Sequence, residues 1–432
     1  MDADIVIKNG MVLTMDEGFT LHEKADLAIK GPKIVDISPQ TKFKARKTIE
    51  AKGRLVMPGL INCHTHAAMV MMRGLADDMP LETWWQKFIF PLEKKLLNPN
   101  FIKIGVGLAA VEMIKSGTTA FSDMYFFEDA AAEVCKKISI RAFLGEGILD
   151  VPTPDFPDIE KTLSFVEGQH EKWKGDPIIH LTVSPHAPYS CSPETLKRSR
   201  QLAEKYDLPL HIHVSETAYE VDEIRQKYGA SPVEHLENIG FLNERVIAAH
   251  CVHLSEKEKE ILVKRQVKVA HCQESNMKLA VGQAPIVELL QKGVAIGLGT
   301  DGAASNNNLD MFDEMDSAAK FHKAVRRDPT VMKAQDVLRL ATSEAARVMQ
   351  RPDLGSLAVG KTADIIIVNL DRPHLTPLYN IYSQLVYSAG GGDVDSAIIN
   401  GKLVMDNREI LTVDEAEIID RANFLAREVS HG

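Results

Sequence analysis

The feature that most constrains the fold is a repeated alternation of short apolar runs and helical segments across the middle of the chain. Segments with helical spacing of apolar residues, such as 193–206 and 256–265, lie between these runs. Parallel strands that alternate with helices are typical of α/β folds, and eight of them predict a (β/α)8 TIM barrel. The eight expected strands are 55–66, 118–124, 141–145, 178–184, 210–214, 246–250, 267–271 and 294–298.

The two ends of the chain have a different pattern. Residues 1–57 contain short strands that run into turn glycines, and two further strands are expected near 363–369 and 397–405. Strands this short need another sheet to pack on. We therefore predict one small β-sandwich domain built from both termini, residues 1–57 plus 355–432, with a C-terminal helix over 413–429. The catalytic barrel domain is expected to span residues 58–354.

Two histidines end the first barrel strand. In an extended strand residues i and i+2 point to the same face, so His64 and His66 point the same way. A His-x-His pair alone arises easily by chance in a chain with 15 histidines. The C-terminal ends of barrel strands meet on one rim, however, and isolated core histidines do not explain why so many strands bring polar residues there. Later strands run into His186, His213 with Glu216, His250 and Asp301.

This rim is predicted to bind one divalent metal ion. Three imidazoles and one carboxylate suit zinc, with Fe²⁺ as the alternative. His211 lies two residues before His213 and deeper in the barrel, so we interpret it as a supporting residue. The pair His271 and Cys272 lacks the Cys–His spacing of structural zinc sites. The predicted ligands are His64, His66, His213 and Asp301.

Two other patterns have simpler interpretations. Residues 297–302 match G-x-G-x-x-G, but no clear helix follows and the βαβ context of a dinucleotide fold is missing, so the glycines are expected to present Asp301. The insert after His66 is rich in methionine and tryptophan, including Trp85. Those side chains either belong to the core or form a lid that contacts substrate.

Composition excludes several classes of partner. The formal net charge of −10 argues against nucleic acid or an anionic membrane surface. The five cysteines form no C-x-x-C pair, which favours a reduced, cytoplasmic location over a disulfide framework. We see no signal peptide and no apolar run long enough to span a bilayer. The sequence leaves the oligomeric state open, a homo-oligomer included.

Several motifs together resemble the amidohydrolase superfamily, and more closely its 5-methylthioadenosine/S-adenosylhomocysteine deaminases. Members with two metal ions carry a carboxylated lysine on strand four, whereas residues 178–186 contain no lysine, which implies a single ion. The resemblance covers nearly the whole chain. It rests on residues 58–66 (PGLINCHTH), 72–79 (MRGLADDM), 91–93 (PLE), 184–189 (SPHAPY), 213–217 (HVSET), 249–253 (AHCVH), 299–306 (GTDGAASN) and 355–368 (GSLAVGKTADIIIV).

The resemblance also implies substrate contacts. Glu93 is expected to hold the ribose hydroxyls, and Trp85 of the lid insert is expected to lie against the substrate. Members that accept S-adenosylhomocysteine can use an arginine near the end of strand three, where this chain has Glu146. The expected small-molecule substrates are methylthioadenosine, S-adenosylhomocysteine, 5′-deoxyadenosine and adenosine. A carboxylate at position 146 disfavours the amino-acid tail of S-adenosylhomocysteine among them. The expected purine contacts are His186, Glu216 and Ser305.

The function that follows is hydrolytic deamination of the adenine ring at C6 by metal-activated hydroxide, yielding the inosine analogue and ammonia. Asp301 is expected to accept the proton of the attacking water, Glu216 to protonate the purine N1, and His250 to hydrogen-bond the hydroxide. One alternative is a related hydrolase that acts on guanine, cytosine, an oxidised purine or a triazine, since those enzymes share the fold. Another is a catalytically inactive barrel, which has no need of the full polar set.

Overall fold

The computed structural model describes residues 1–79 and 81–430, and its centre is a barrel of parallel strands. One group of strands pairs in the order β6, β7, β8 and then β9 and β10, and a second group pairs in the order β11 to β14. The strands are β6 (Leu60–Thr65), β7 (Thr118–Tyr125), β8 (Arg141–Ile148), β9 (Ile179–Leu181), β10 (Ser184–Pro185), β11 (Leu210–Val214), β12 (Val246–His250), β13 (Lys268–His271) and β14 (Ile296–Leu298).

Two contacts close the barrel. A parallel bridge between Val183 and Leu210 joins the two groups of strands on one side. On the other side, the amide of Asp301, just beyond β14, donates to the carbonyl of His64 at 2.9 Å. The predicted (β/α)8 class is therefore confirmed. The expected single strand at 178–184 is instead two short strands, because Val183 turns its amide away from β8 to the carbonyl of Pro209.

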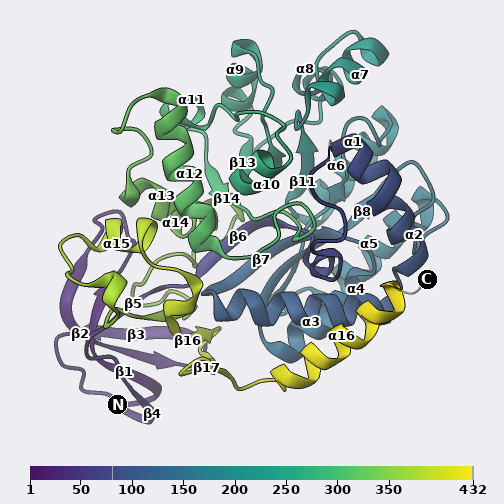
Figure 1. Cartoon of the computed structure of the whole chain (residues 1–432). Coiled ribbons are helices and arrows are strands. Elements are labelled where there is room, and N and C mark those ends of the chain that lie inside the picture. Colours follow the sequence, from purple (N-terminus) through teal and green to yellow (C-terminus); the bar gives the residue numbers. More distant parts are fainter. Residues whose placement is uncertain (80, 431–432) are drawn as a thin grey trace.

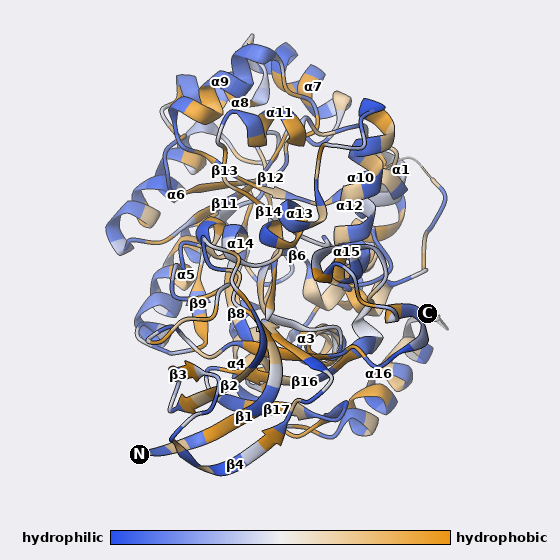
Figure 2. Cartoon of the chain, turned by 90° about the vertical axis from the view of Figure 1, so that its left-hand side faces the viewer, coloured by the Kyte–Doolittle hydropathy of each residue, from blue (hydrophilic) through white to orange (hydrophobic). Residues whose placement is uncertain are grey.

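Helices follow the strands and cover the barrel. Figure 2 shows apolar strands in the interior and mixed, outwardly hydrophilic helices around them, as amphipathic helices require. Their ends match sequence signals: α6 begins at Pro193, after Ser192, whose hydroxyl accepts the amide of Thr195. They are α3 (Pro99–Lys115), α4 (Glu128–Ile138), α5 (Ile159–Trp173), α6 (Pro193–Tyr206), α7 (Ala218–Tyr228), α8 (Pro232–Asn238), α9 (Glu256–Lys264), α10 (Gln273–Lys278), α11 (Ile286–Gln291), α12 (Met311–Arg326), α13 (Ala334–Leu340) and α14 (Ser343–Val348).

The insert after β6 is folded, not an open loop. It continues from His66 into η1 (Ala67–Met72), whose side chains are mostly buried. Three consecutive helical turns follow, α1 (Leu81–Trp84), the π-helical η2 (Trp85–Ile89) and α2 (Phe90–Leu96). Trp84 and Ile89 join the hydrophobic core, while Phe88 and Phe90 remain partly exposed. The insert therefore packs on the barrel rim and still presents apolar side chains above it, and below we call residues 73–96 the lid.

Strands from both termini join in one nine-stranded sheet below the barrel (Figure 1). Its strand β1 pairs with β2 along most of its length, and on its other edge with β4 near its start and with β5 near its end, so the two halves of the sheet enclose one apolar core. The strands are β1 (Asp2–Leu13), β2 (Leu21–Lys30), β3 (Lys33–Ser38), β4 (Lys44–Glu50), β5 (Arg54–Pro58), β15 (Ile365–Asn369), β16 (Val394–Ile399), β17 (Lys402–Asp406) and β18 (Glu409–Ile410). Division of the chain into two domains stays a prediction.

The remaining C-terminal helices return to the barrel. α15 (Ile381–Tyr387), which lies between the short turns η3 (Pro373–Leu375) and η4 (Gly391–Asp393), packs against α12 and α13. α16 (Glu415–Ser430) lies along α3 in Figure 1, and Lys115 of α3 binds Glu415 at 2.7 Å. None of the helices in the described part of the chain is long and apolar enough to cross a membrane.

Two of the contacts between the sheet and the barrel are closely defined by the sequence. Gly59 separates β5 from β6, and a Cβ atom there would lie 2.0 Å from the hydroxyl of Thr119, so only glycine fits. The fully buried guanidinium of Arg141, at the start of β8, makes a bidentate pair with Asp364, just before β15, at 2.7 and 3.0 Å. Asp364 also accepts the amide of Asn400. This ion pair fixes the sheet under the barrel on the face opposite the catalytic rim.

Removal of this counter-charge should destabilise the fold without touching the rim. We expect Asp364→Asn to lower the free energy of unfolding by about 3–5 kcal/mol, because it leaves a guanidinium buried without its carboxylate. The control is Lys47→Ala, which breaks an ion pair whose lysine side chain is half exposed and should cost less than about 1 kcal/mol. Urea denaturation of both variants is the measurement, and equal losses would contradict the role of the pair.

Candidate active site

Four of the predicted metal ligands converge at the C-terminal rim of the barrel. His64 and His66, from the end of β6, turn their Nε2 atoms toward one carboxylate oxygen, Oδ1 of Asp301, at 3.5 and 3.2 Å. The ring of His213, from β11, lies 4.9 Å from that of His64 and 5.4 Å from that of His66. The alternation of side chains along a strand, which predicted that the two β6 histidines share a face, therefore holds.

The second nitrogen of each imidazole is already in use. His64 Nδ1 contacts Nε2 of the buried His211 at 3.0 Å, and His66 Nδ1 donates to the carbonyl of Met124 at 2.6 Å. His213 Nδ1 donates to the carbonyl of His186 at 2.8 Å. Such partners fix the ring orientation and leave the Nε2 atoms for a metal. His64 Nε2 is buried and makes no hydrogen bond within the described residues.

Two overlapping sets of ligand atoms lie close enough to share an ion. One contains His64, His66 and Asp301, and the other contains His64, His213 and His250. His250, at the end of β12, was predicted to act on the attacking oxygen, and its Nε2 lies 3.9 Å from Oε1 of Glu216. Its position next to both His64 and His213 places it at the edge of the same cluster.

Burial keeps most of these imidazoles neutral. It lowers the pKa of His64 to about 4 and that of His186 to about 3, and it holds the pKa of His213 well below its ordinary value. Burial acts in the same direction on His66, but the Asp301 carboxylate reverses the effect and raises its pKa to about 9. A neutral imidazole is the form that binds a metal, so the low pKa values of His64 and His213 favour binding of a metal cation over binding of protons.

The loop after β14 brings Asp301 to the cluster. A Cβ atom at Gly299 would lie 2.7 Å from the amide nitrogen of His64, so the glycine lets the loop approach β6. Asp301 itself has a φ of 61°, in the left-handed region that non-glycine residues seldom adopt. Ser305 lines the cavity, and its hydroxyl donates to Oδ2 of Asp301 at 2.9 Å. One carboxylate oxygen therefore faces the histidines while the other is held from behind.

Sequence reasoning missed two supporting residues on α10. The hydroxyl of Ser275 donates to Oδ2 of Asp301 at 2.7 Å, and Oδ1 of Asn276 accepts from Nδ1 of His250 at 3.0 Å. Because the Nδ1 proton of His250 is donated to Asn276, this tautomer presents the lone pair of Nε2 to the cavity. The signal was available, because α10 directly follows the seventh barrel strand and so begins at the catalytic rim.

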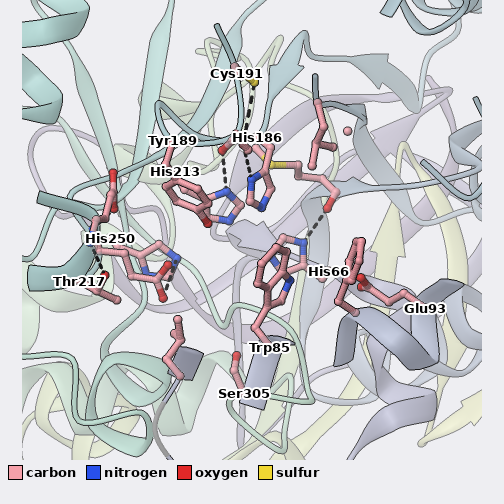
Figure 3. A pocket seen from close by; sticks show the side chains of 18 of the residues that line it. His66, Trp85, Glu93, His186, Tyr189, Cys191, His213, Thr217, His250 and Ser305 are labelled. Carbon is pink, nitrogen blue, oxygen red and sulfur yellow. Dashed lines mark hydrogen bonds and ion pairs between the residues drawn. The ribbon is translucent and has the colours of Figure 1, made fainter. Parts of the chain in front are cut away.

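These groups line a cavity of about 610 Å³ under the lid. Figure 3 shows His66, His213 and His250 around its floor, with Glu93 and Trp85 on one side and Thr217 on the other. The sequence-predicted residues that line it are His66, Trp85, Glu93, His186, His213, Glu216, His250, Asp301 and Ser305. Most of the predicted set, from the lid and from the ends of five different barrel strands, is thus brought to one cavity.

Two acidic residues of the cavity, Glu93 and Glu216, are held by partners that the sequence did not reveal. Glu93, buried in α2, accepts a 2.7 Å hydrogen bond from the hydroxyl of Tyr125 at the end of β7. Burial raises the pKa of Glu93 to about 7, and the Tyr125 hydroxyl limits the rise. The backbone amide of Glu216 donates to the buried carboxylate of Glu220 at 2.8 Å, which fixes the loop that carries Glu216.

Glu146 does not lie where the sequence placed it. It is buried behind the wall of the cavity, is not among the lining residues, and accepts the backbone amide of Glu128 at 3.0 Å. Burial raises the pKa of its carboxyl well above the ordinary value, and Asp155 adds to the rise. Position along β8 indicated the correct strand end, but the side chain turns toward the β7–α4 connection. Glu146 therefore lies outside the cavity in which a substrate tail would bind.

Comparisons with known proteins agree with this geometry. The chain is 47% identical to the 5-methylthioadenosine/S-adenosylhomocysteine deaminase of Syntrophobacter fumaroxidans, over 99% of this chain and 98% of that protein. It is 44% identical to the 5′-deoxyadenosine deaminase of Methanosarcina acetivorans, again over 99% and 98% of the two chains.

A solved structure matches equally completely. The zinc-bound adenosine deaminase from Xanthomonas campestris has a TM-score of 0.98 and 37% identity, over 100% of this chain and 99% of that one. The sequence profile described as the amidohydrolase family matches residues 55–404. The rim of imidazoles, the barrel that supports it and these similarities lead to one conclusion: the chain belongs to the amidohydrolase family.

Proposed function

We propose that the protein is a zinc-dependent deaminase that hydrolyses the 6-amino group of 5′-substituted adenosines. The observation that carries the proposal is that one cavity contains both the histidine–aspartate cluster and a buried carboxylate, Glu93, on the lid side. The first suits a water-activating cation and the second suits a sugar diol. Relatives named as deaminases of methylthioadenosine, S-adenosylhomocysteine, 5′-deoxyadenosine and adenosine support the same substrate class.

The described residues fit a zinc ion. The proposed ligands are Nε2 of His64, His66 and His213 and Oδ1 of Asp301, three imidazole nitrogens and one carboxylate oxygen. The orphaned, buried Nε2 of His64 supports this assignment, because an unpartnered polar atom inside a protein is costly. A bound zinc ion supplies Lewis-acid activation of the attacking water at neutral pH.

The chain's own residues then handle the protons. Asp301 accepts the proton of the attacking water, and its Oδ2 is held meanwhile by the hydroxyls of Ser275 and Ser305. The Nε2 lone pair of His250 orients the attacking oxygen, as Asn276 fixes the tautomer. Protonated Glu216, on the loop held by Glu220, delivers its proton to the ring nitrogen next to C6 and recovers one from the C6 hydroxyl as the carbonyl forms. The departing ammonia takes the proton that Asp301 removed from water. His186 and Trp85 are placed to contact the purine.

Glu93 favours a nucleoside over a bare ring. A related hydrolase that acts on guanine, cytosine or a triazine gains nothing from a buried carboxylate on the lid side, because those rings carry no ribose. Ammonia release from a panel of adenosine, methylthioadenosine, 5′-deoxyadenosine, guanine and cytosine tests the choice. Turnover of adenine nucleosides alone supports the proposal, and turnover of a bare base alone refutes it.

The lining of the cavity limits the 5′ substituent. Its carboxylates are Glu93, Asp150, Glu216, Glu220, Glu223 and Asp301, whereas Lys227 is the only lysine and no arginine is present among the described lining residues. The carboxylate of an amino-acid tail would therefore meet mostly acidic side chains, while an apolar tail would meet Phe90, Val151 and Tyr219, which are partly exposed at the entrance. These charges favour methylthioadenosine and 5′-deoxyadenosine over S-adenosylhomocysteine.

The cysteines support a reducing compartment. All five are free and buried, at Cys63, Cys135, Cys191, Cys251 and Cys272. Burial raises the pKa of Cys63 and holds it as an inert thiol. We therefore place the enzyme in the cytoplasm.

Metal content is the first prediction of this function. The purified protein should carry about one zinc ion per chain, because the cluster offers one set of four ligands. His64→Ala should lose most of the zinc and essentially all deaminase activity, since it deletes the imidazole shared by both sets of ligand atoms. His235→Ala, a buried histidine on α8 outside the cluster, is the control and should keep both. Elemental analysis of zinc and an assay of deaminase activity, both before and after chelation, test the prediction. Activity that survives complete zinc removal would contradict the role of the metal.

The second prediction concerns the tail. Wild-type kcat/KM should be at least about tenfold higher for methylthioadenosine than for S-adenosylhomocysteine, a difference of about 1.4 kcal/mol. Val151→Lys adds a cation at the entrance and should narrow the ratio several-fold, as partly exposed ion pairs contribute up to about 1 kcal/mol. Val359→Lys, exposed and not among the cavity residues, should leave the ratio unchanged. Wild-type preference for S-adenosylhomocysteine would show that the acidic wall does not control the tail.

A further inference from the structure

The end of β7 contacts both the metal cluster and the lid. Two consecutive residues make these contacts. The carbonyl of Met124 accepts a hydrogen bond from Nδ1 of His66, and the hydroxyl of Tyr125 donates one to Oε1 of Glu93. Tyr125 is 5% exposed and Glu93 is 7% exposed, so this hydrogen bond is shielded from bulk water. Both Tyr125 and Glu93 line the cavity, with Glu93 beside His66 in Figure 3.

We propose that Tyr125 is a positioning residue for ribose recognition, which fixes Glu93 as an ionised acceptor aimed at the sugar hydroxyls. The inference rests on the proposed nucleoside deaminase function and assigns a role to a residue that the sequence motifs did not single out. Within the described residues, Oε1 of Glu93 has the Tyr125 hydroxyl as its partner and Oε2 makes no hydrogen bond. The carboxylate therefore keeps Oε2 and one lone pair of Oε1 for the 2′ and 3′ hydroxyls.

Charge explains why the partner is needed. A buried carboxylate tends to take up a proton, and a protonated Glu93 would offer the sugar a donor in place of one of its acceptors. A hydroxyl that donates to the carboxylate stabilises the ionised form, and hydrogen bonds to charged groups are the stronger class. The phenol is also a rigid donor, because it stands at the end of a barrel strand. Glu93, by contrast, belongs to a short lid helix and needs an external anchor.

The turn that carries Tyr125 is itself held by carboxylates. Glu128 accepts the amide of Tyr125 at 3.0 Å, Asp155 accepts that of Phe127 at 2.8 Å, and Glu146 accepts that of Glu128 at 3.0 Å. Phe127 has a φ of 55°, a left-handed conformation that needs such support. Glu146 therefore acts on the ribose end of the site through this turn, and not on the 5′ tail through direct contact.

A simpler interpretation treats the Tyr125 hydroxyl as a buried phenol that merely satisfies its own hydrogen bond. The two interpretations differ in substrate dependence. If Tyr125 only shapes the cavity wall, its loss affects every adenine nucleoside alike. If it holds Glu93 for the sugar, its loss affects nucleosides that carry the diol and spares those without it.

The test compares methylthioadenosine with its 2′,3′-dideoxy analogue. Tyr125→Phe should lower kcat/KM for methylthioadenosine roughly tenfold to a hundredfold, mainly through KM, since a hydrogen bond to a charged group is lost. The dideoxy analogue should change by less than about twofold. Tyr382→Phe, which removes another single phenol hydrogen bond far from the cavity, controls for stability and should change neither substrate.

A double-mutant cycle isolates the coupling. In a Glu93→Ala background, Tyr125→Phe should cost nothing further on methylthioadenosine, because its target is already gone. Glu146→Gln keeps the carbonyl acceptor for the Glu128 amide and should preserve the preference for the diol, whereas Glu146→Leu should weaken it in the direction of Tyr125→Phe.

Three outcomes overturn the inference. An equal loss on both substrates, or an undiminished loss in the Glu93→Ala background, assigns Tyr125 a structural role only. Wild-type protein that releases no ammonia from any adenine nucleoside removes the proposed function, and this inference with it, before any variant is compared. The wild-type measurement therefore separates failure of the function from failure of the Tyr125 role.

Discussion

The active site depends on the closure of the barrel between its first and last strands. The hydrogen bond from the Asp301 amide to the His64 carbonyl is part of that closure, and it joins the only carboxylate of the proposed metal set to the first of its histidines. Residues 237 positions apart in the chain thus become neighbours through main-chain geometry. The left-handed conformation of Asp301 and the close approach of Gly299 are local strains that this closure maintains.

Burial then determines the chemistry of the cluster. Packed apolar strands surround the rim residues, and the loss of water lowers the proton affinity of His64, His186 and His213. The same desolvation acts in the opposite sense on Glu93, whose neutral form it favours. One physical effect therefore favours the neutral imidazoles that a cation requires and makes the carboxylate that we propose to bind the sugar dependent on a partner. Polar residues behind the site, on α10 and at the end of β7, supply such partners.

Much of this arrangement could be predicted from the sequence, because strand periodicity and barrel topology are local or symmetric rules. They indicated the fold, the shared face of His64 and His66, and the strand ends that carry His213 and Asp301. The split of the fourth strand could not be foreseen, since it arises from a change of hydrogen-bond partner at Val183. The direction of Glu146 depends on a rotamer and on the amide of Glu128, a contact that no spacing encodes.

The supporting residues were missed for a related reason. Ser275 and Asn276 lie in the helix that follows the strand ending at His271. Their place in the chain puts them at the catalytic rim, but their residue types do not distinguish them from ordinary helix-start residues. Their importance appears only when the partner residues, Asp301 and His250, are known to face them. Long-range pairs of this kind are a property of the packed molecule, whereas ligand positions on strand ends are a property of the chain.

The adjacency of Met124 and Tyr125 has a consequence for substrate shape. The carbonyl of Met124 holds His66, and the side chain of the next residue, Tyr125, holds Glu93, the proposed acceptor for the sugar. The span between these two points therefore cannot change without distortion of a barrel strand. The distance between the group that faces the ring and the group that faces the sugar is thus set by the barrel strand. On this proposal, nucleosides are selected by the distance and angle between ring and sugar, and the 5′ substituent is selected separately by the side chains at the mouth of the cavity.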